Sequence, residues 1–207
     1  MITVDEINKD KEMDLRIKRS KGLIYDALVR LLEEMDYKYI TIKNITEEAA
    51  VSRPTFYRIY RNKDEILLKY MDEIFEEFFS SILENLRNDQ NHDILGRKLF
   101  EKWRDNRDFF VSLQKADLLF KVLERFVDYS ALFQEELKRK ENKKNTHFHR
   151  YLANCCGGGI FMMLYSWFQD SLNPGANDIG EVLGKFYKFI FEETKYYDSI
   201  GDSDSES

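Results

Sequence analysis

The residues best suited to bind another molecule lie in the segment 41–60, where cationic, hydroxyl and phenol side chains recur at helical spacing. Arg53, Thr55, Tyr57 and Arg58 share the second half of this segment. Arginine can donate two hydrogen bonds to a guanine edge, a threonine methyl can touch a thymine methyl, and tyrosine hydroxyls suit phosphate oxygens. This set of side chains predicts contact with double-stranded DNA.

Two short helices are predicted to position these side chains. The first helix begins after Thr41 and the second after Ser52, because both residue types are favoured N-caps. Pro54 is tolerated in the first turn of the second helix, where backbone amides have no intrahelical acceptor. The pattern is that of a helix-turn-helix, in which the residues that pack the two helices together are Ile42, Ile45, Ala49, Val51 and Phe56.

The charge of the chain is unevenly distributed. The net charge is −6, yet residues 1–70 carry 14 Lys+Arg against 13 Asp+Glu, and the segment 51–63 holds four cations and no acid. A second cationic cluster lies in the segment 16–21. A local basic patch on an acidic chain suits docking on a phosphate backbone at one end. The alternative is that these charges form an ordinary solvated helix face.

The rest of the chain also has helical periodicity. Glycine and proline are scarce, at 9 and 2 residues, which disfavours an all-β fold. An amphipathic helix is predicted over 17–35 after a loose arm at 1–14, and a long helix follows the N-cap Asn62. Five more helices are predicted beyond a polar link at 88–91. The expected fold is all-α with about nine helices, in which a long helix joins a DNA-binding domain (1–62) to a ligand-binding and dimerisation domain (63–197), followed by a disordered acidic tail (198–207).

The helix-turn-helix segment resembles the TetR family of bacterial repressors. The resemblance covers about the first 70 residues and is carried by Thr41, Ile42, Ile45, Ala49, Val51, Ser52, Thr55, Phe56, Tyr57, Asn62, Lys63, Asp64, Glu65 and Leu67. It implies a homodimer with a recognition helix in the major groove and a divergent C-terminal half that binds an inducer. The DNA-contacting positions that it implies are Lys43, Ser52, Arg53, Pro54, Thr55, Tyr57, Arg58 and Lys63.

The chain departs from the family pattern at the joint between the two helices. Ala50 stands where the family prefers glycine, and a residue with a side chain resists a positive φ angle. Thr46 replaces an alanine, Pro54 replaces a frequent glycine, and Ile59-Tyr60 replaces the usual pair of aromatic residues.

Aromatic residues crowd the C-terminal half and predict an apolar effector pocket, with an ordinary aromatic core as the alternative. The predicted pocket residues are Phe75, Phe78, Trp103, Phe110, Phe120, Phe126, Tyr151 and Cys155. The last two long helices are apolar over wide stripes and predict a four-helix interface between two copies. The predicted interface residues are Gly158, Leu164, Trp167, Phe168, Leu183, Phe186 and Ile190.

Two further features of this half have structural explanations that outweigh chemical ones. His147, Tyr151 and Cys155 share one helix face, but a stripe lining a core or pocket is favoured over a metal site, and no metal or cofactor is predicted. Three consecutive glycines, residues 157–159, are explained either by close approach of another helix, which we favour, or by a bend in the helix. Cys155 and Cys156 are adjacent, so a strained vicinal disulfide is a minor alternative, and paired cysteines of this kind fit a reducing cytoplasm.

The predicted function is a DNA-binding transcriptional regulator, a repressor that a small apolar or aromatic ligand releases from its operator. The alternative is a helical protein-interaction adaptor that does not bind DNA. An enzyme is not predicted, because the sequence has no GxGxxG, P-loop, HExxH or GxSxG motif. No apolar run is long enough for a membrane span and no signal peptide is recognised, so the expected location is the cytoplasm.

Overall fold

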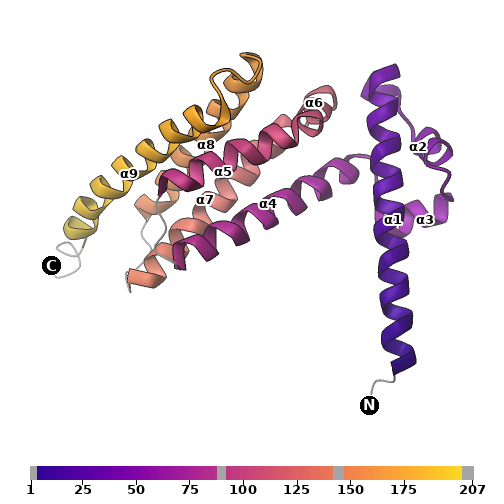
Figure 1. Ribbon diagram of the computed structural model, residues 1–207, viewed down its shortest axis with the longest axis horizontal. Helices are drawn as coiled ribbons and strands as arrows, with labels where there is room; N and C mark the ends of the chain where they lie inside the picture. The colour runs from indigo at the N-terminus through magenta and orange to yellow at the C-terminus, as the bar shows by residue number, and fades with distance from the viewer. Residues whose placement is uncertain (1–3, 88–91, 142–146, 202–207) are drawn as a thin grey trace. The chain divides into compact units, whose positions relative to one another are not determined.

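The computed structural model describes residues 4–87, 92–141 and 147–201, and within these ranges all the regular secondary structure is helical. Nine α-helices and one short 3-10 turn follow one another (Figure 1). The elements are α1 (Val4–Glu34), the 3-10 turn η1 (Tyr37–Tyr39), α2 (Ile42–Glu48), α3 (Arg53–Ile59), α4 (Asp64–Arg87), α5 (His92–Asp105), α6 (Arg107–Lys115), α7 (Leu119–Glu141), α8 (His147–Gln169) and α9 (Ala176–Gly201). The all-α prediction with about nine helices is confirmed.

The predicted loose arm at the N-terminus is wrong, because α1 already begins at Val4. The sequence between Val4 and Asp14 contains no proline or glycine, and Asp5 and Lys9 stand four residues apart with opposite charge. Such a stretch extends a helix at little cost when the following residues already form one. At the other end, α9 runs through the first residues of the predicted tail to Gly201, and the predicted polar link at 88–91 and the remainder of the tail lie outside the described residues.

The chain forms two compact units, which are described separately. The first unit comprises residues 1–73 together with 108–121, and the second comprises residues 74–107 and 122–207. The division differs from the predicted boundary at residue 62, because residues 64–73 of α4 and nearly all of α6 belong to the first unit.

The core of the first unit is built from the predicted stripe of α1. Ile24, Ala27 and Leu28 are fully buried, as are Ile45 of α2 and Phe56 of α3. These side chains repeat every three or four residues along α1, so that one face of the helix is covered while the other remains in water. Figure 1 shows α2 and α3 beside α1.

Helix α6 joins the first unit through aromatic stacking and one lysine. The rings of Tyr25 and Tyr70 stack with centroids 4.3 Å apart, and Phe109 meets Tyr70 edge-on at 4.8 Å. Lys115 Nζ donates a hydrogen bond of 2.9 Å to the carbonyl oxygen of Leu32 near the end of α1. A cation at a helix C-terminus satisfies a carbonyl that has no intrahelical partner.

The second unit is a bundle of the rest of α4 with α5, α7, α8 and α9 (Figure 1). The ring of Phe100 packs edge-on against that of Trp167, and both side chains are buried. Helices α5 and α9 cross closely at a pair of glycines, where a Cβ on Gly96 would lie 2.1 Å from the carbonyl oxygen of Gly180. None of the described helices is long and apolar enough to span a membrane.

The three glycines of α8 serve in part for a close helix contact. A Cβ on Gly157 would lie 2.7 Å from the backbone of Val127 in α7, so only a glycine fits there. The explanation by close approach is therefore confirmed for Gly157, and α8 is one continuous helix through it. Gly158 and Gly159 have open space where their side chains would be.

Candidate functional site

The predicted N-caps fix the first residues of both helices of the helix-turn-helix. The Thr41 hydroxyl accepts a hydrogen bond of 3.2 Å from the Asn44 amide, and Asn44 Oδ1 in turn accepts one of 3.0 Å from the Thr41 amide. Ser52 Oγ accepts a hydrogen bond of 3.2 Å from the Thr55 amide at the start of α3. Because each cap satisfies backbone groups that the helix leaves free, both helices begin at defined residues.

The joint between α2 and α3 contains an alanine in the left-handed region. Ala50 has φ of 51°, and the following Val51 amide donates to the Thr46 carbonyl. A left-handed backbone places Cβ close to the following carbonyl oxygen and costs about 1–2 kcal/mol for a residue other than glycine. The alanine thus adopts the turn that the family forms with glycine, at a cost in stability.

Replacing Ala50 with glycine is expected to raise the free energy of unfolding by about 0.5–1 kcal/mol. Glycine removes the strain of the left-handed backbone but loses more conformational entropy on folding than alanine does. The strain energy removed is larger than this entropic cost by about 0.5–1 kcal/mol. Chemical denaturation of the two proteins would measure the difference. A destabilised Ala50→Gly variant would show that the joint is not strained, whereas Ala49→Gly, inside the helical region beside it, should be destabilised.

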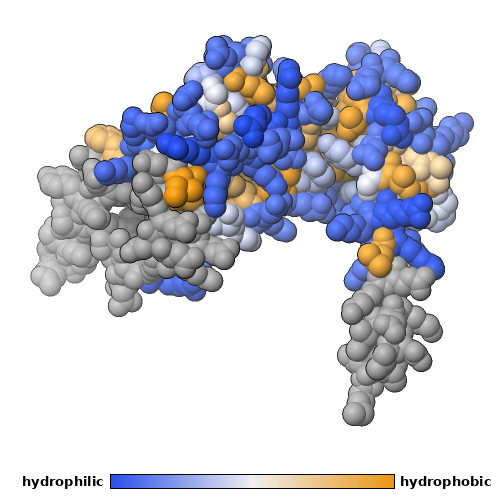
Figure 2. All heavy atoms as spheres, in the orientation of Figure 1, coloured by the Kyte–Doolittle hydropathy of each residue, from blue (hydrophilic) through white to orange (hydrophobic). Residues whose placement is uncertain are grey.

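The outward face of α3 carries the predicted DNA-contacting side chains. Arg53, Pro54, Tyr57 and Arg58 are exposed, while Phe56 is fully buried on the opposite face. Among the described residues neither guanidinium has an ion-pair partner. In Figure 2, hydrophilic and hydrophobic atoms are mixed over the region where Figure 1 places α2 and α3. Two unpaired guanidiniums beside an exposed phenol form a surface that can donate hydrogen bonds to an anionic partner.

Three other predicted positions lie around this face with different surroundings. Thr55 is half-buried, and its Oγ1 is 2.8 Å from Ser52 Oγ. Lys43 on α2 is exposed, and its ammonium lies 3.8 Å from Glu47. Such an exposed pair is weak and screened by salt, so Lys43 remains able to meet a phosphate.

Lys63 is directed into the protein rather than toward the outward face of α3. Its Nζ donates to the carbonyl oxygens of Tyr37 at 2.6 Å and Ile40 at 2.9 Å, and it lies 4.1 Å from the centre of the Tyr37 ring. The Tyr37 hydroxyl donates to Asp64, and burial together with that bond raises the Tyr37 pKa. The Lys63 ammonium thus satisfies the carbonyls of Tyr37 in η1 and of Ile40 after it, and the contact of Lys63 with phosphate stays a prediction.

The first turns of α4 also fix the end of α3. Lys69 Nζ donates a hydrogen bond of 2.6 Å to the Ile59 carbonyl. The predicted N-cap is confirmed, since Asn62 Oδ1 accepts from the Glu65 amide at 3.0 Å. The Glu65 carboxylate accepts from the Arg61 amide at 3.0 Å, and this bond lowers the Glu65 pKa. The start of α4 is thus tied to the C-terminal end of α3 and to the segment before α2.

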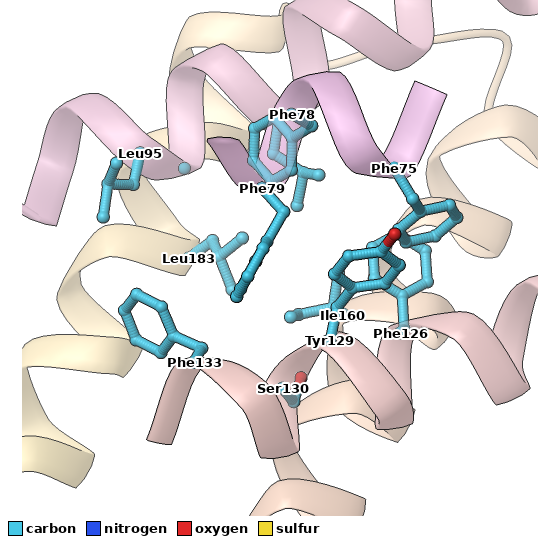
Figure 3. Close-up of a pocket in the computed structure, with 12 residues that line it drawn as sticks. Phe75, Phe78, Phe79, Leu95, Phe126, Tyr129, Ser130, Phe133, Ile160 and Leu183 are labelled. Carbon is cyan, nitrogen blue, oxygen red and sulfur yellow. The ribbon is translucent and has the colours of Figure 1, made fainter. Parts of the chain in front are cut away.

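The second unit contains an apolar cavity among α4, α5, α7, α8 and α9. Its empty volume is about 620 Å³, a figure that includes the part open to solvent. Figure 3 shows its aromatic wall. The lining residues are Phe75, Phe78, Phe79, Leu95, Gly96, Leu99, Phe126, Tyr129, Ser130, Phe133, Ile160 and Leu183.

Three of the eight predicted pocket residues, Phe75, Phe78 and Phe126, line this cavity. Trp103 lies just behind the wall, with its ring 5.9 Å from that of Phe75. The other four do not line it: Phe110 and Phe120 belong to the first unit, and Tyr151 and Cys155 are exposed on α8. Periodicity identified inward faces, but it could not show that α6 packs on α1 and α4.

The predicted interface residues divide between the core and the surface. Leu164, Trp167 and Leu183 are buried within the protomer, and the Trp167 indole donates to the Pro174 carbonyl at 2.6 Å. Phe186 is 39% exposed, Phe168 is half-buried and Gly158 has open space around it. The Ile190 side chain lies outside the described residues. The first three residues therefore hold the bundle together and do not face a partner.

The two cysteines differ in environment. Cys155 is exposed and Cys156 is buried, and burial, with the neighbouring thiol as a smaller cause, raises the pKa of Cys156 to about 12. Both are free thiols. No cluster of three or more His, Cys, Asp or Glu side chains capable of holding a metal ion is present in the part of the chain that the structure describes.

The sequence of the first unit matches known bacterial regulators. Residues 24–70 match the family described as bacterial regulatory proteins, tetR family. A curated relative, an uncharacterized HTH-type transcriptional regulator (YxbF) of Bacillus subtilis strain 168, is 40% identical over 63 residues, which is 30% of this chain and 17% of the relative. The chain spans 17% and 57% of the two curated relatives that it matches.

Solved structures share the fold of most of this chain. A regulator from Syntrophomonas wolfei assigned to the TetR family aligns with a TM-score of 0.66 at 19% identity, over 84% of this chain and 95% of that one. The transcriptional regulator FadR from Bacillus subtilis, in complex with stearoyl-CoA, aligns with a TM-score of 0.54 at 16% identity, over 79% and 95% of the two chains.

The fold and the helix-turn-helix together define a class of protein. The chain shares the helical fold of those structures, and the capped helices α2 and α3 lie in its first unit. Within that unit, residues 24–70 match the tetR family of bacterial regulatory proteins, and this match covers less than half of the chain.

Proposed function

We propose that this protein is a transcriptional regulator that reads double-stranded DNA with α3. The observation that carries the proposal is the outward face of α3, where Arg53 and Arg58 flank an exposed Tyr57 without an ion-pair partner in the described chain. Lys43 adds a cation at the edge of the same helix pair. Guanidiniums on a helix that fits a major groove can bond guanine edges and phosphates.

A second copy of the chain is proposed to cover an exposed face of α8 and α9. Tyr151 and Met162 on α8 are 67% and 54% exposed, and Val182 and Phe189 on α9 are 55% and 61% exposed. Gly158 lies between the first two, with room for another helix to approach. Large apolar side chains that share a surface mark an interface, and a two-fold dimer would place two reading helices on one operator.

Replacing Met162 with arginine is expected to separate this dimer. Two unpaired guanidiniums buried near a two-fold axis raise the dissociation constant by roughly 100-fold or more. Sedimentation velocity over a range of micromolar concentrations would measure it. Leu15→Arg, at a 67% exposed position on α1, is the matched control and should stay dimeric. A monomeric wild-type protein, or an unchanged Met162→Arg variant, would contradict this interface.

Occupation of the cavity by a small apolar ligand is proposed to control DNA binding through α4. This single helix carries Phe75, Phe78 and Phe79 in the cavity wall, and its first turns hold α3 through Lys69. Reading helices enter successive major grooves only when they are about 34–36 Å apart. A ligand that favours a different position of α4 therefore shifts the population away from the DNA-binding form.

The proposal is tested by gel shifts with DNA selected from a random pool and with DNA from upstream of the protein's own gene. A specific shift that a small apolar compound reverses is expected for a ligand-released repressor. A helical adaptor that binds another protein would give no preferred DNA sequence, and that result would overturn the proposal. A specific shift that no cavity ligand reverses would refute the control by ligand alone.

A further inference from the structure

The cavity has one fully buried polar side chain in an otherwise apolar wall. Ser130 on α7 is 6% exposed and lines the cavity, and its hydroxyl has no hydrogen-bond partner among the residues that the structure describes. Figure 3 shows the Ser130 oxygen directed toward the middle of the cavity. A buried hydroxyl without a partner is unfavourable, so a ligand group that forms a hydrogen bond with it removes that cost.

The remaining lining side chains exclude a charged ligand group. Apart from Ser130, the one polar side chain among the described lining residues is the phenol of Tyr129. Its ring stacks on Phe75 at 5.2 Å and meets Phe79 edge-on at 5.1 Å. Among the residues that the structure describes, no lysine, arginine, histidine or carboxylate lines the cavity. An ionised group placed here would lose its hydration without gaining a counter-charge.

We infer that the cavity binds an uncharged apolar ligand whose single hydroxyl or carbonyl group hydrogen-bonds to Ser130. Aromatic rings surround the apolar part of the ligand, and Ser130 selects the position of its polar group. A site that hydrogen-bonds a ligand hydroxyl discriminates against an analogue that lacks it, because the protein group is then left unpaired. The inference rests on the proposed role of the cavity as the effector site, but it concerns binding and not the response of the DNA complex.

The test uses the full chain and three probes of similar shape: 4-butylphenol, n-butylbenzene and ionised 4-butylbenzoate. The affinity of each probe is measured by its displacement of the neutral fluorescent compound N-phenyl-1-naphthylamine from the cavity. The tryptophan emission, to which Trp103 behind the wall contributes, provides a second signal. The comparison is made within each probe between proteins, because the probes differ in their own hydration.

Ser130→Ala is expected to weaken the binding of 4-butylphenol by about 3- to 10-fold, which is the effect of one hydrogen bond. The same variant should weaken the binding of n-butylbenzene by less than about 2-fold. Ser112→Ala is the matched control, since Ser112 is equally buried but donates to the Asp108 carbonyl in the other unit. Ser130→Thr, which keeps a hydroxyl, should keep the preference for 4-butylphenol over n-butylbenzene. Ionised 4-butylbenzoate should bind much more weakly than 4-butylphenol.

Several results would overturn the inference. One is an equal loss of affinity for 4-butylphenol and n-butylbenzene in the Ser130→Ala variant. Another is tight binding of 4-butylbenzoate by the wild-type protein. The third is that the wild-type protein does not bind N-phenyl-1-naphthylamine. Selective binding through Ser130 that leaves the DNA complex unaffected would support the inference and count only against control of DNA binding by the ligand. The two proposals therefore fail separately.

Discussion

An alanine at Arg53 is expected to weaken binding to a selected operator by roughly 30-fold or more and to relax the sequence preference. Each arginine that bonds a guanine edge contributes about 1–3 kcal/mol to discrimination, and a dimer contains two copies of Arg53. The side chain is exposed in the first turn of α3, where residues of a reading helix meet base edges. Fluorescence anisotropy with the selected duplex and with a scrambled duplex would measure both effects.

Two variants distinguish base reading from general charge in this experiment. Arg53→Lys keeps the cation but loses the bidentate geometry, so it should bind scrambled DNA almost as the wild type does while losing preference for the operator. Lys63→Ala removes a cation that is occupied by the Tyr37 and Ile40 carbonyls. We expect it to lower the stability of the first unit rather than the dependence of DNA binding on salt. Equal loss on both duplexes for Arg53→Ala would contradict base reading.

An alanine at Gly180 is expected to lower the free energy of unfolding by about 3 kcal/mol. Its Cβ would lie 2.5 Å from Arg97 Cα and 2.6 Å from Arg97 N, closer than carbon atoms approach in folded proteins. Both neighbours are backbone atoms of α5, so no side-chain rotation relieves the clash and the two helices have to move apart. Overpacking of this kind costs about 1–3 kcal/mol and occasionally more. Urea denaturation followed by circular dichroism would give the value.

Gly22→Ala is the matched control for this prediction. Gly22 lies inside α1, is exposed, and has nothing within 4 Å of the position where a Cβ would lie. Alanine is the better helix former, so this variant should be more stable by about 0.5–1 kcal/mol. If Gly180→Ala were as stable as the wild type, the close crossing of α5 and α9 would be wrong.

The parts of the fold that depend on local chemistry could be predicted from the sequence. The N-caps Thr41, Ser52 and Asn62 all accept a hydrogen bond from an amide three residues later. A cap and its amide are neighbours in the chain, so residue type and spacing are sufficient to find them. The same holds for the apolar stripe of α1, which is set by a period of 3.6 residues.

The features that sequence reasoning missed depend on contacts between distant residues. The sequence motif predicts that Lys63 contacts DNA. In the structure, its ammonium donates hydrogen bonds to carbonyls 23 and 26 residues earlier in the chain. Phe110 was expected in the pocket because it is aromatic, and only the docking of α6 on the first unit shows otherwise. Ser130 carried no motif. The available signal was a lone hydroxyl among Phe126, Tyr129 and Phe133 on one helix face.

The central claim, that α3 reads DNA, is tested most directly by measuring affinity for a selected duplex over a range of salt concentrations. Six to ten phosphates neutralised per dimer predict that the logarithm of the association constant falls against the logarithm of salt with a slope of about −5 to −9. Arg58→Ala should make that slope less steep, by about two for the two copies in a dimer, if Arg58 meets a phosphate. No selectable duplex, or an affinity that does not change with salt, would contradict the claim.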